Sequence, residues 1–364
     1  MGSCASDCIC SDFSVENESQ KHIVIRMMKI YHAILATAFA LAPAILNAGE
    51  VTLYTHRHYE ADEKLFAEFA KESGIKVNVV KSGADQLMER LKQEGENSPA
   101  DLLMTADAGR LHRAKASGLL QPATSEILTK QVPASLRDPD DQWFGFTSRA
   151  RVIVYSKERV QPAELSTYEN LTDKKWRGRI LVRSSSNIYN QSLLASMIAA
   201  HGEKEALAWV RAVRGNMARA PQGSDRDQMR GVAAGLADIA IVNTYYVGLL
   251  KNSSDPKDRE VAKKIGVFFP NQDGRGTHIN VSGAGVVKTS KNKAEAVKLL
   301  EFLASPKAQA SFPNATYEYP VVQGITWSDL LKTWGDFKPD SLNLAKLGEL
   351  NKAAVKLFGK AGWE

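Results

Sequence analysis

From residue 51 onward, short apolar runs alternate with segments that have the periodicity of helices. VTLYT at 51–55 precedes a helical pattern over 60–73, and KVNVV at 76–80 precedes another over 84–95, which leads to the apolar run ADLLMTA at 100–106. Strands separated by helices of this length are typical of a parallel sheet covered by helices on both faces. The sequence therefore predicts an α/β fold built from doubly wound sheets.

Two longer β-rich stretches interrupt this alternation. WFGFTSRARVIVYS at 143–156 has no helix behind it for some distance, and KIGVFFP at 264–270 is followed closely by NVSGAGVVK at 280–288. We interpret them as two crossings between lobes, which together would form a hinge. The predicted division is an N-terminal lobe of residues 49–148 and 265–310 and a C-terminal lobe of residues 149–264 and 311–364.

Residues 28–48 have the composition of a secretory signal peptide. A positive charge at Lys29 precedes an apolar stretch over 33–45, and small Ala48 ends the segment. This apolar stretch is too short for a stable membrane span. We therefore expect export to the periplasm and interpret residues 1–27 as an upstream over-extension of the reading frame.

An alternative interpretation of this end is acylation, because residues 1–6 fit an N-myristoylation pattern and Cys4 could carry a second acyl chain. Acylation would leave the apolar stretch that follows unexplained. All three cysteines fall within the first ten residues, so the rest of the chain has no thiol for a disulfide or a soft metal.

The composition, with 44% hydrophobic and 24% charged residues, excludes a membrane protein with many spans. The formal net charge of +6 is mild, and no run of Lys and Arg interleaved with aromatic residues is present. We therefore expect no nucleic-acid partner.

Two adjacent pairs of unusual side chains, His58-Tyr59 and Tyr245-Tyr246, each follow a strand-like run. Tyr189 also follows such a run, at the start of a helical pattern. Ligands of open α/β sheets bind outside the carboxyl ends of the strands, so these side chains are placed to meet in a cleft. Phenolate oxygen is a hard donor and imidazole a borderline one, a combination that suits a small, highly charged cation such as Fe(III).

Four motifs then carry a resemblance: RHY at 57–59, SRARVIVYS at 148–156, SSNIYNQSL at 185–193 and NTYYVG at 243–248. With them the chain resembles, over residues 49–364, the periplasmic iron-binding proteins that supply ABC-type ferric iron importers. The resemblance implies a two-lobe periplasmic binding-protein fold of the type II kind and Fe(III) as the cargo. It also implies a monomer whose partners are an inner-membrane ABC permease and its ATPase.

The resemblance is to the branch of that family that needs no anion, and it implies a ligand set. Carried over position by position, the ligands are His58, Tyr59, Tyr189, Tyr245 and Tyr246. Other branches hold a phosphate or carbonate near the position of Tyr189 and lack that tyrosine. Its presence here implies that no synergistic anion is required.

Four phenolates carry one more negative charge than Fe(III) balances, and a buried residual charge needs a partner. Arg149 is the expected partner in the surroundings of the metal, with Arg57 and Arg151 as less favoured candidates. Asn243, a good helix N-cap just before Tyr245, is also expected beside the site.

Two other functions compete with this interpretation. His56 and His58 with Glu60 or Asp62 would resemble the two-histidine, one-carboxylate iron site of an oxygenase, but such a site needs open coordination positions that five protein donors do not leave. We therefore expect no enzyme and no ligand role for His56. A binding protein for thiamine, a polyamine or a phosphonate could use residues 184–186 to bind an anion, but it would have no use for the tyrosines.

Overall fold

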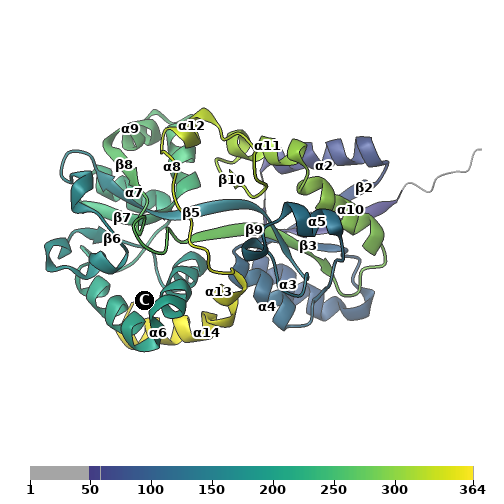
Figure 1. The fold of residues 1–364 in the computed structure, drawn as a ribbon, viewed down its shortest axis with the longest axis horizontal. Helices are drawn as coiled ribbons and strands as arrows, with labels where there is room; N and C mark the ends of the chain where they lie inside the picture. The colour runs from purple at the N-terminus through teal and green to yellow at the C-terminus, as the bar shows by residue number, and fades with distance from the viewer. Residues whose placement is uncertain (1–48, 58, 364) are drawn as a thin grey trace, which may run out of the picture. The chain divides into compact units, whose positions relative to one another are not determined.

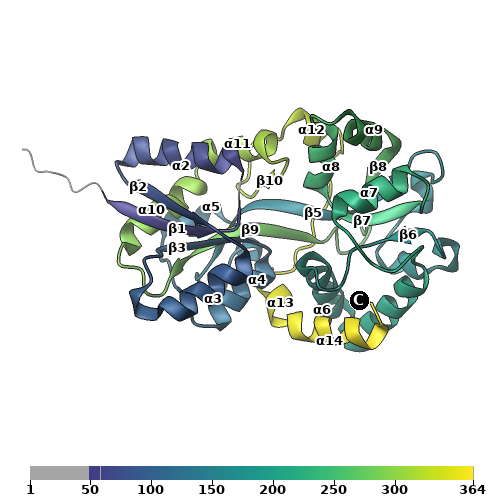
Figure 2. The ribbon, with the colours of Figure 1, turned by 180° about the vertical axis from the view of Figure 1, so that it is seen from behind.

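In the computed structural model, residues 49–57 and 59–363 are described. The predicted signal peptide, the upstream extension, the three cysteines and His58 therefore lie outside the described residues. The described chain forms two sheets that share one long strand, β5 (Phe144–Ser156), as Figures 1 and 2 show.

The first sheet runs in the order β2-β1-β3-β9-β5, with β4 paired to β9 and β10 paired to β5. Its other strands are β1 (Glu50–Thr55), β2 (Lys76–Lys81), β3 (Leu102–Ala106), β4 (Leu120–Gln121), β9 (Ile279–Val287) and β10 (Tyr319–Pro320). In the second sheet β5 lies between β7 and β8, and β7 pairs with β6. The added strands are β6 (Ile180–Leu181), β7 (Ile239–Asn243) and β8 (Ile265–Phe268).

The strand directions match the predicted parallel pattern only in part. β1 is parallel to both β2 and β3, and β6 is parallel to β7. The long strands β5 and β9 are antiparallel to each other, because the chain leaves the first sheet along β5 and returns to it along β9. Both sheets are therefore mixed, with antiparallel pairing where the chain crosses between the lobes.

Helices cover both faces of each sheet (Figure 1). In the first lobe α2, α10 and α11 lie on one face and α3 and α4 on the other, and in the second lobe α7, α8 and α9 lie opposite α6. The helices are α2 (Glu60–Ser73), α3 (Ala84–Glu94), α4 (Ala108–Ala116), α5 (Glu126–Gln131), α6 (Ile188–Gly215), α7 (Asp225–Ala233), α8 (Thr244–Lys251), α9 (Pro256–Lys264), α10 (Lys293–Leu303), α11 (Pro306–Ala315), α12 (Asp329–Lys332), α13 (Ala345–Glu349) and α14 (Asn351–Ala361). Short 3₁₀ helices are Gly95–Asn97, Ala134–Leu136, Pro162–Glu164, Glu169–Thr172 and Lys174–Trp176. Over the described ranges, none of these helices combines the length and the apolar character that crossing a membrane requires.

The helix α2 shows how the sequence pattern becomes packing. Leu65, Phe66 and Phe69 recur three and four residues apart, so they lie on one face and are buried against the sheet, as predicted. Gly74 ends the helix in the left-handed region at φ 72°, which a residue without a Cβ adopts at little cost.

The strand pairings differ from the predicted lobe boundaries at two places. β8, which the sequence assigned to the N-terminal lobe, pairs with β5 in the second sheet, and β10, assigned to the C-terminal lobe, pairs with Thr147 and Ser148 in the first sheet. The residues of a short strand show that it is extended and buried, but they do not select its neighbour. We infer that the chain returns to the N-terminal lobe at β9 and that β10 belongs to that lobe.

The C-terminal residues form two short helices, α13 and α14. Leu347 is buried in α13, and Ala354 and Leu357 are buried in α14. α13 contacts α4 of the first lobe and α6 of the second, while α14 packs along α6. The C-terminal helices therefore contact both lobes on one side of the molecule.

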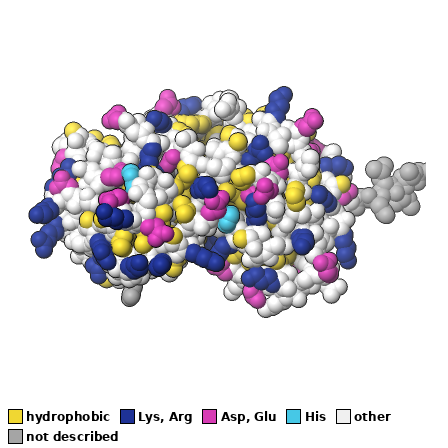
Figure 3. All heavy atoms as spheres, turned by 60° about the horizontal axis from the view of Figure 1, so that its bottom comes forward, with side chains coloured by type: hydrophobic (Ala, Val, Ile, Leu, Met, Phe, Trp, Pro, Cys, Tyr) yellow, Lys and Arg dark blue, Asp and Glu magenta, His cyan; other side chains and the backbone are white. Residues whose placement is uncertain are grey.

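Charged side chains of both signs are interspersed over the face drawn in Figure 3. This is the pattern of a solvated surface, which the mild net charge of the sequence also indicates.

We expect Gly283→Ala to destabilise the protein. Gly283 in β9 pairs with Gly145 in β5, and a Cβ at Gly283 would lie 2.2 Å from the carbonyl oxygen of Phe144. Relieving such a contact costs about 1–3 kcal/mol in the free energy of unfolding, measurable by urea denaturation. Gly359→Ala is the control, because nothing lies within 4 Å of a Cβ at that helical position and alanine favours the helix. Equal stability of the Gly283→Ala variant and the parent would contradict the close approach of the two strands.

Candidate metal centre

Tyr59 lies where the chain has left β1 and is about to enter α2. It occupies the N-cap position with extended backbone angles, φ −84° and ψ 136°. The guanidinium carbon of Arg57 lies 4.9 Å from the centre of the Tyr59 ring. The predicted histidine ligand, His58, lies outside the described residues.

Tyr245 and Tyr246 lie in the first turn of α8. β7 ends at Asn243 and the helix begins at Thr244, as the sequence predicted. Because both tyrosines follow this change from strand to helix, their rings lie together, with centroids 4.1 Å apart and planes inclined by 33°. Tyr245 is buried and Tyr246 is half-buried.

Tyr189 reaches the same place from the start of α6. The side chain of Asn187 accepts a hydrogen bond of 3.0 Å from the backbone N–H of Tyr189 and so caps this helix. The hydroxyl oxygen of Tyr189 lies 3.3 Å from that of Tyr245.

The four tyrosines line a single cavity of about 470 Å³. The structure therefore brings together four of the five predicted ligands from three elements distant in sequence. The other residues that line the cavity are His56, Arg57, Ala106, Arg110, Arg149, Arg226, Leu249 and Ser282. Over residues 49–57 and 59–363, no cluster of three or more His, Cys, Asp and Glu side chains offers another metal site.

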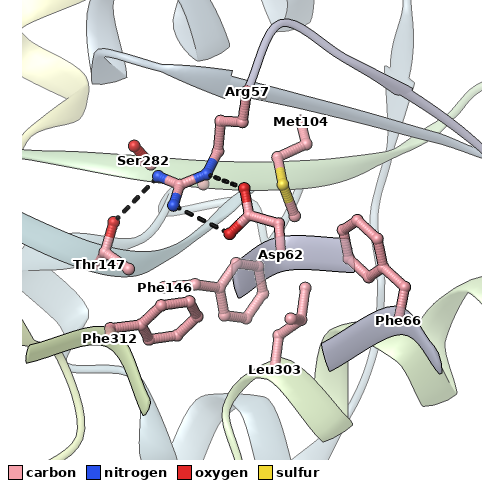
Figure 4. Close-up of a pocket in the computed structure, with 10 residues that line it drawn as sticks. Arg57, Asp62, Phe66, Met104, Phe146, Thr147, Ser282, Leu303 and Phe312 are labelled. Atoms are coloured by element: carbon pink, nitrogen blue, oxygen red, sulfur yellow. Dashed lines mark hydrogen bonds and ion pairs between the residues drawn. The ribbon is translucent and has the colours of Figure 1, made fainter. Parts of the chain in front are cut away.

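Arg57 is held beside the cavity by buried carboxylates. Its Nε and Nη2 donate to Asp62 at 2.8 and 3.1 Å, and its Nη1 donates to Glu318 at 3.0 Å. Figure 4 shows the Arg57–Asp62 pair beside Thr147 and above an apolar pocket. The apolar side chains of that pocket are Phe66, Met104, Phe146, Leu303 and Phe312.

Arg149, the predicted charge partner, is also tied to Glu318. Its Nη2 donates to Glu318 and to Ser282, and its guanidinium carbon lies 5.7 Å from the centre of the Tyr245 ring. Its Nε and Nη1 are buried and have no hydrogen-bond partner among residues 49–57 and 59–363. The negative charges of Asp62 and Glu318 thus balance the positive charges of Arg57 and Arg149. Arg149 still has two N–H groups available to donate hydrogen bonds.

A second arginine group lies beside Tyr189. Arg151 and Arg183 lie 5.9 and 5.8 Å from the centre of its ring, and both form ion pairs with the fully buried Asp225. Two cations therefore share one carboxylate, which leaves one positive charge in surplus.

Asn243 takes part in this second group rather than capping its helix. Its side-chain oxygen accepts a hydrogen bond of 3.1 Å from Arg151, and its backbone N–H donates to Asp225 at 2.9 Å. The predicted cap hydrogen bond of its side chain does not form. Within the described chain, the hydrogen bonds of Asn243 are therefore with Arg151 and Asp225 and not with a tyrosine.

Burial controls the protonation of the tyrosine hydroxyl groups in the cavity. Desolvation raises the pKa of Tyr246 to about 12, and it also raises the pKa values of Tyr59 and Tyr245. The neighbouring Tyr189 raises all three further, while Arg149 acts in the opposite direction on Tyr59 and Tyr245. These three phenols are therefore protonated at neutral pH.

Two groups of the alternative site with two histidines and a carboxylate, His56 and Asp62, already have protein partners. The Nδ1 of His56 accepts a hydrogen bond of 3.3 Å from the backbone N–H of Ala106, and both oxygens of Asp62 are bound by Arg57. A carboxylate neutralised by a bidentate arginine is a poor metal ligand.

Residues 55–310 match the family model for bacterial extracellular solute-binding proteins. The chain belongs to that family. This solute-binding protein is 53% identical to iron uptake protein A1 of Synechocystis over 315 residues, covering 86% of this chain and 88% of the relative. It is 29% identical to the major ferric iron-binding protein of Neisseria meningitidis over 338 residues, covering 92% and 98%.

The solved structures that the solute-binding protein resembles have the predicted two-lobe periplasmic binding-protein fold. The FutA protein of Trichodesmium in complex with iron and citrate ligands superposes with a TM-score of 0.86 at 52% identity, over 87% of this chain and 100% of that chain. The ferric binding protein of Campylobacter jejuni superposes with a TM-score of 0.81 at 45% identity, over 86% and 100%.

Sequence reasoning missed several charged residues of the solute-binding protein that surround the tyrosines. Glu318 and Asp225 hold the two arginine groups, and Arg226 lies 5.9 Å from the centre of the Tyr246 ring. Glu318 lies 261 residues from Arg57, and Asp225 lies 74 residues from Arg151. No local pattern links residues so far apart.

We expect Glu318→Gln to lower the free energy of unfolding of the solute-binding protein strongly at pH 7. Burial opposes ionisation of this carboxyl, but Arg149 and Arg57 outweigh it and lower its pKa below the ordinary value. Removing one partner of a buried ion pair costs about 3–5 kcal/mol in the free energy of unfolding. Glu349→Gln, which breaks an exposed pair with Lys346, should cost less than about 1 kcal/mol.

The sign of the pH dependence gives a second test of Glu318. A carboxyl with a lowered pKa stabilises the folded state above the unfolded value, about 4.3, and this contribution disappears as the pH falls. The difference in stability between parent and Glu318→Gln, measured by urea denaturation, should therefore shrink below pH 4. A constant difference down to acidic pH would show that Glu318 is not ionised in the folded protein.

Proposed function

We propose that this protein captures Fe(III) in the cavity between its two lobes and delivers it to an ABC permease of the inner membrane. The observation that carries the proposal is the convergence of Tyr59, Tyr189, Tyr245 and Tyr246 on one cavity surrounded by arginines. Phenolate oxygens are hard donors, and a set of four selects a small trivalent cation over softer or larger ions. The names of the relatives, iron uptake and ferric iron-binding proteins, support the same cargo.

His58 is proposed as the fifth ligand. It directly precedes Tyr59 in the RHY motif, at the carboxyl end of β1. A neutral imidazole adds a donor without adding charge, so the complete set carries one negative charge beyond what Fe(III) balances.

The arginines can balance that charge. Arg151 and Arg183 share one carboxylate and hold a surplus positive charge, and Arg149 keeps two buried donors beside the tyrosines. This arrangement revises the expectation from sequence, because the surplus lies with the group around Asp225 while Arg149 is already paired with Glu318.

We also propose that no synergistic anion is needed. The hydroxyl of Tyr189 lies within 3.3 Å of the hydroxyl of Tyr245, so a protein oxygen is available where an anion would otherwise complete the shell. The hydroxyls of Ser184 and Ser186 bond to each other at 3.0 Å, which leaves them less suited to hold an anion.

The proposed function implies where the protein acts and which proteins it binds. A protein that supplies an inner-membrane importer acts on its outer side, and residues 28–48 have the composition of the signal peptide that export needs. The proposed location is the periplasm, and the proposed partners are the permease and its ATPase.

Capture is proposed to precede closure. Tyr189, Tyr245 and Tyr246 belong to the second lobe and Tyr59 to the first. A metal bound by ligands of both lobes stabilises the closed arrangement through contacts that the open one lacks.

The proposal is tested with the double variant Tyr245→Phe and Tyr246→Phe. Iron added to the parent in buffer free of carbonate, phosphate and citrate should give a visible phenolate-to-iron absorbance band at one iron per protein. The double variant should lose most of this band and bind Fe(III) at least about 100-fold more weakly, since loss of even indirect support for a ligand costs 10–100-fold. Tyr317→Phe, outside the cavity, is the matched control and should keep the band. A full band in the double variant would refute the ligand assignment.

Iron binding should release protons, because burial keeps the pKa values of Tyr59, Tyr245 and Tyr246 above their usual range. Each phenol that coordinates iron at pH 7 loses one proton, so binding weakens as the pH falls. A pH-stat titration, in which parent and variant receive the same ferric chelate, should show about two more protons released by the parent than by the Tyr245→Phe, Tyr246→Phe variant. Equal release would mean that the two phenols stay protonated beside the metal.

A further inference from the structure

A second cavity, of about 690 Å³, lies along the same helix that carries the tyrosine pair. Helix α8 presents Tyr245 and Tyr246 to the first cavity, and it presents Val247 and Lys251 to the second. The second cavity is completed by the end of β5, by β8 and α9 and by the segment after α12. In Figure 1, β8, α8 and α9 lie together at one end of the molecule. Within the described part of the chain, the two cavities share no lining residue.

Four cationic side chains from three elements surround this second cavity. They are Lys157 after β5, Lys251 on α8, and Arg259 and Lys263 on α9. No Asp or Glu is among its lining residues within the described chain.

The four cations are only partly neutralised. Lys263 forms an ion pair with Glu260, at 2.6 Å, and Arg259 donates to the carbonyl groups of the loop before its helix. Lys251 is exposed and has no ion-pair or hydrogen-bond partner among the described residues. The cavity is therefore a region of concentrated positive charge.

The floor of the cavity is apolar and aromatic. The ring of Tyr155 lies across β8 at Gly266, where a Cβ would come within 2.2 Å of the ring. Trp334 lines the cavity from the segment after α12, and Val247 and Ile265 complete its apolar surface. A glycine in the edge strand thus makes room for an aromatic surface that faces a basic rim.

Isolated lysines on a helix are ordinarily no more than a solvated surface. Here the cations converge from different elements on one hollow, whose volume lies in the range of small-molecule sites, about 300–1,000 Å³. We propose that this cavity binds a small organic anion with an aromatic or apolar body and at least one carboxylate, phosphate or sulfonate group. The proposal does not depend on iron binding.

The test uses 8-anilinonaphthalene-1-sulfonate as the probe, because it combines an apolar ring system with one anionic group. Fluorescence titration of the full protein without iron should show one site. The double variant Lys251→Glu and Lys263→Glu should bind the probe at least about tenfold more weakly, since each loses a charge-assisted contact. Lys352→Glu with Lys356→Glu, on the exposed face of α14, changes the net charge equally and should leave binding unchanged.

Two further measurements separate the parts of the proposal. Gly266→Val displaces the Tyr155 ring and should abolish binding of the probe, with thermal unfolding confirming that the variant is folded. N-phenyl-1-naphthylamine, which lacks the sulfonate, and inorganic phosphate, which lacks the rings, should each bind at least about tenfold more weakly than the probe.

Probe binding that survives both the Lys251→Glu, Lys263→Glu variant and Gly266→Val would overturn the proposal. So would its loss in the Tyr245→Phe, Tyr246→Phe variant, because the probe would then occupy the tyrosine cavity. Retention of probe binding in that tyrosine variant, together with loss of the iron band, would support the second cavity separately from the proposed iron site.

Discussion

The pairing of β5 with β9 is the constraint on which the rest of the molecule depends. β5 is hydrogen-bonded to the first sheet through β9 and β10 and to the second sheet through β7 and β8. The two strands approach closely because glycine occupies the facing positions Gly145 and Gly283. Both sheets therefore contain the same continuous strand, β5. A side chain in the middle of β5 consequently lies between the two lobes.

Arg149 and Arg151 occupy that middle position, two residues apart on β5. Each is anchored to a carboxylate of a different group, Arg149 to Glu318 and Arg151 to Asp225. Carboxylates this deeply buried are stable as ions only when paired, so the arginines and the acids fix each other. The result is a frame of buried, paired arginines beside the tyrosines.

Under the proposed iron binding, this frame would allow buried phenols to serve as metal ligands. Burial alone keeps them protonated, because the charged form of a tyrosine is poorly solvated there. In the proposed site, a trivalent cation at their hydroxyl groups would reverse that preference, and the arginines would stabilise the negative charge left over. Binding and release of the proposed cargo would then be coupled to protons, since every phenolate that leaves the metal can take up a proton.

The α/β class and the positions of the four tyrosines at strand ends could be predicted from the residues alone, because each rests on a local signal. Periodicity shows which residues are buried, and the change from strand to helix at Asn243 puts Tyr245 and Tyr246 at the end of a strand. Only the tertiary structure decided which sheet β8 and β10 join, since strand pairing depends on partners far along the chain. It alone revealed Glu318 and Asp225, because the cost of burying a charge is met by whichever opposite charge the fold brings within reach.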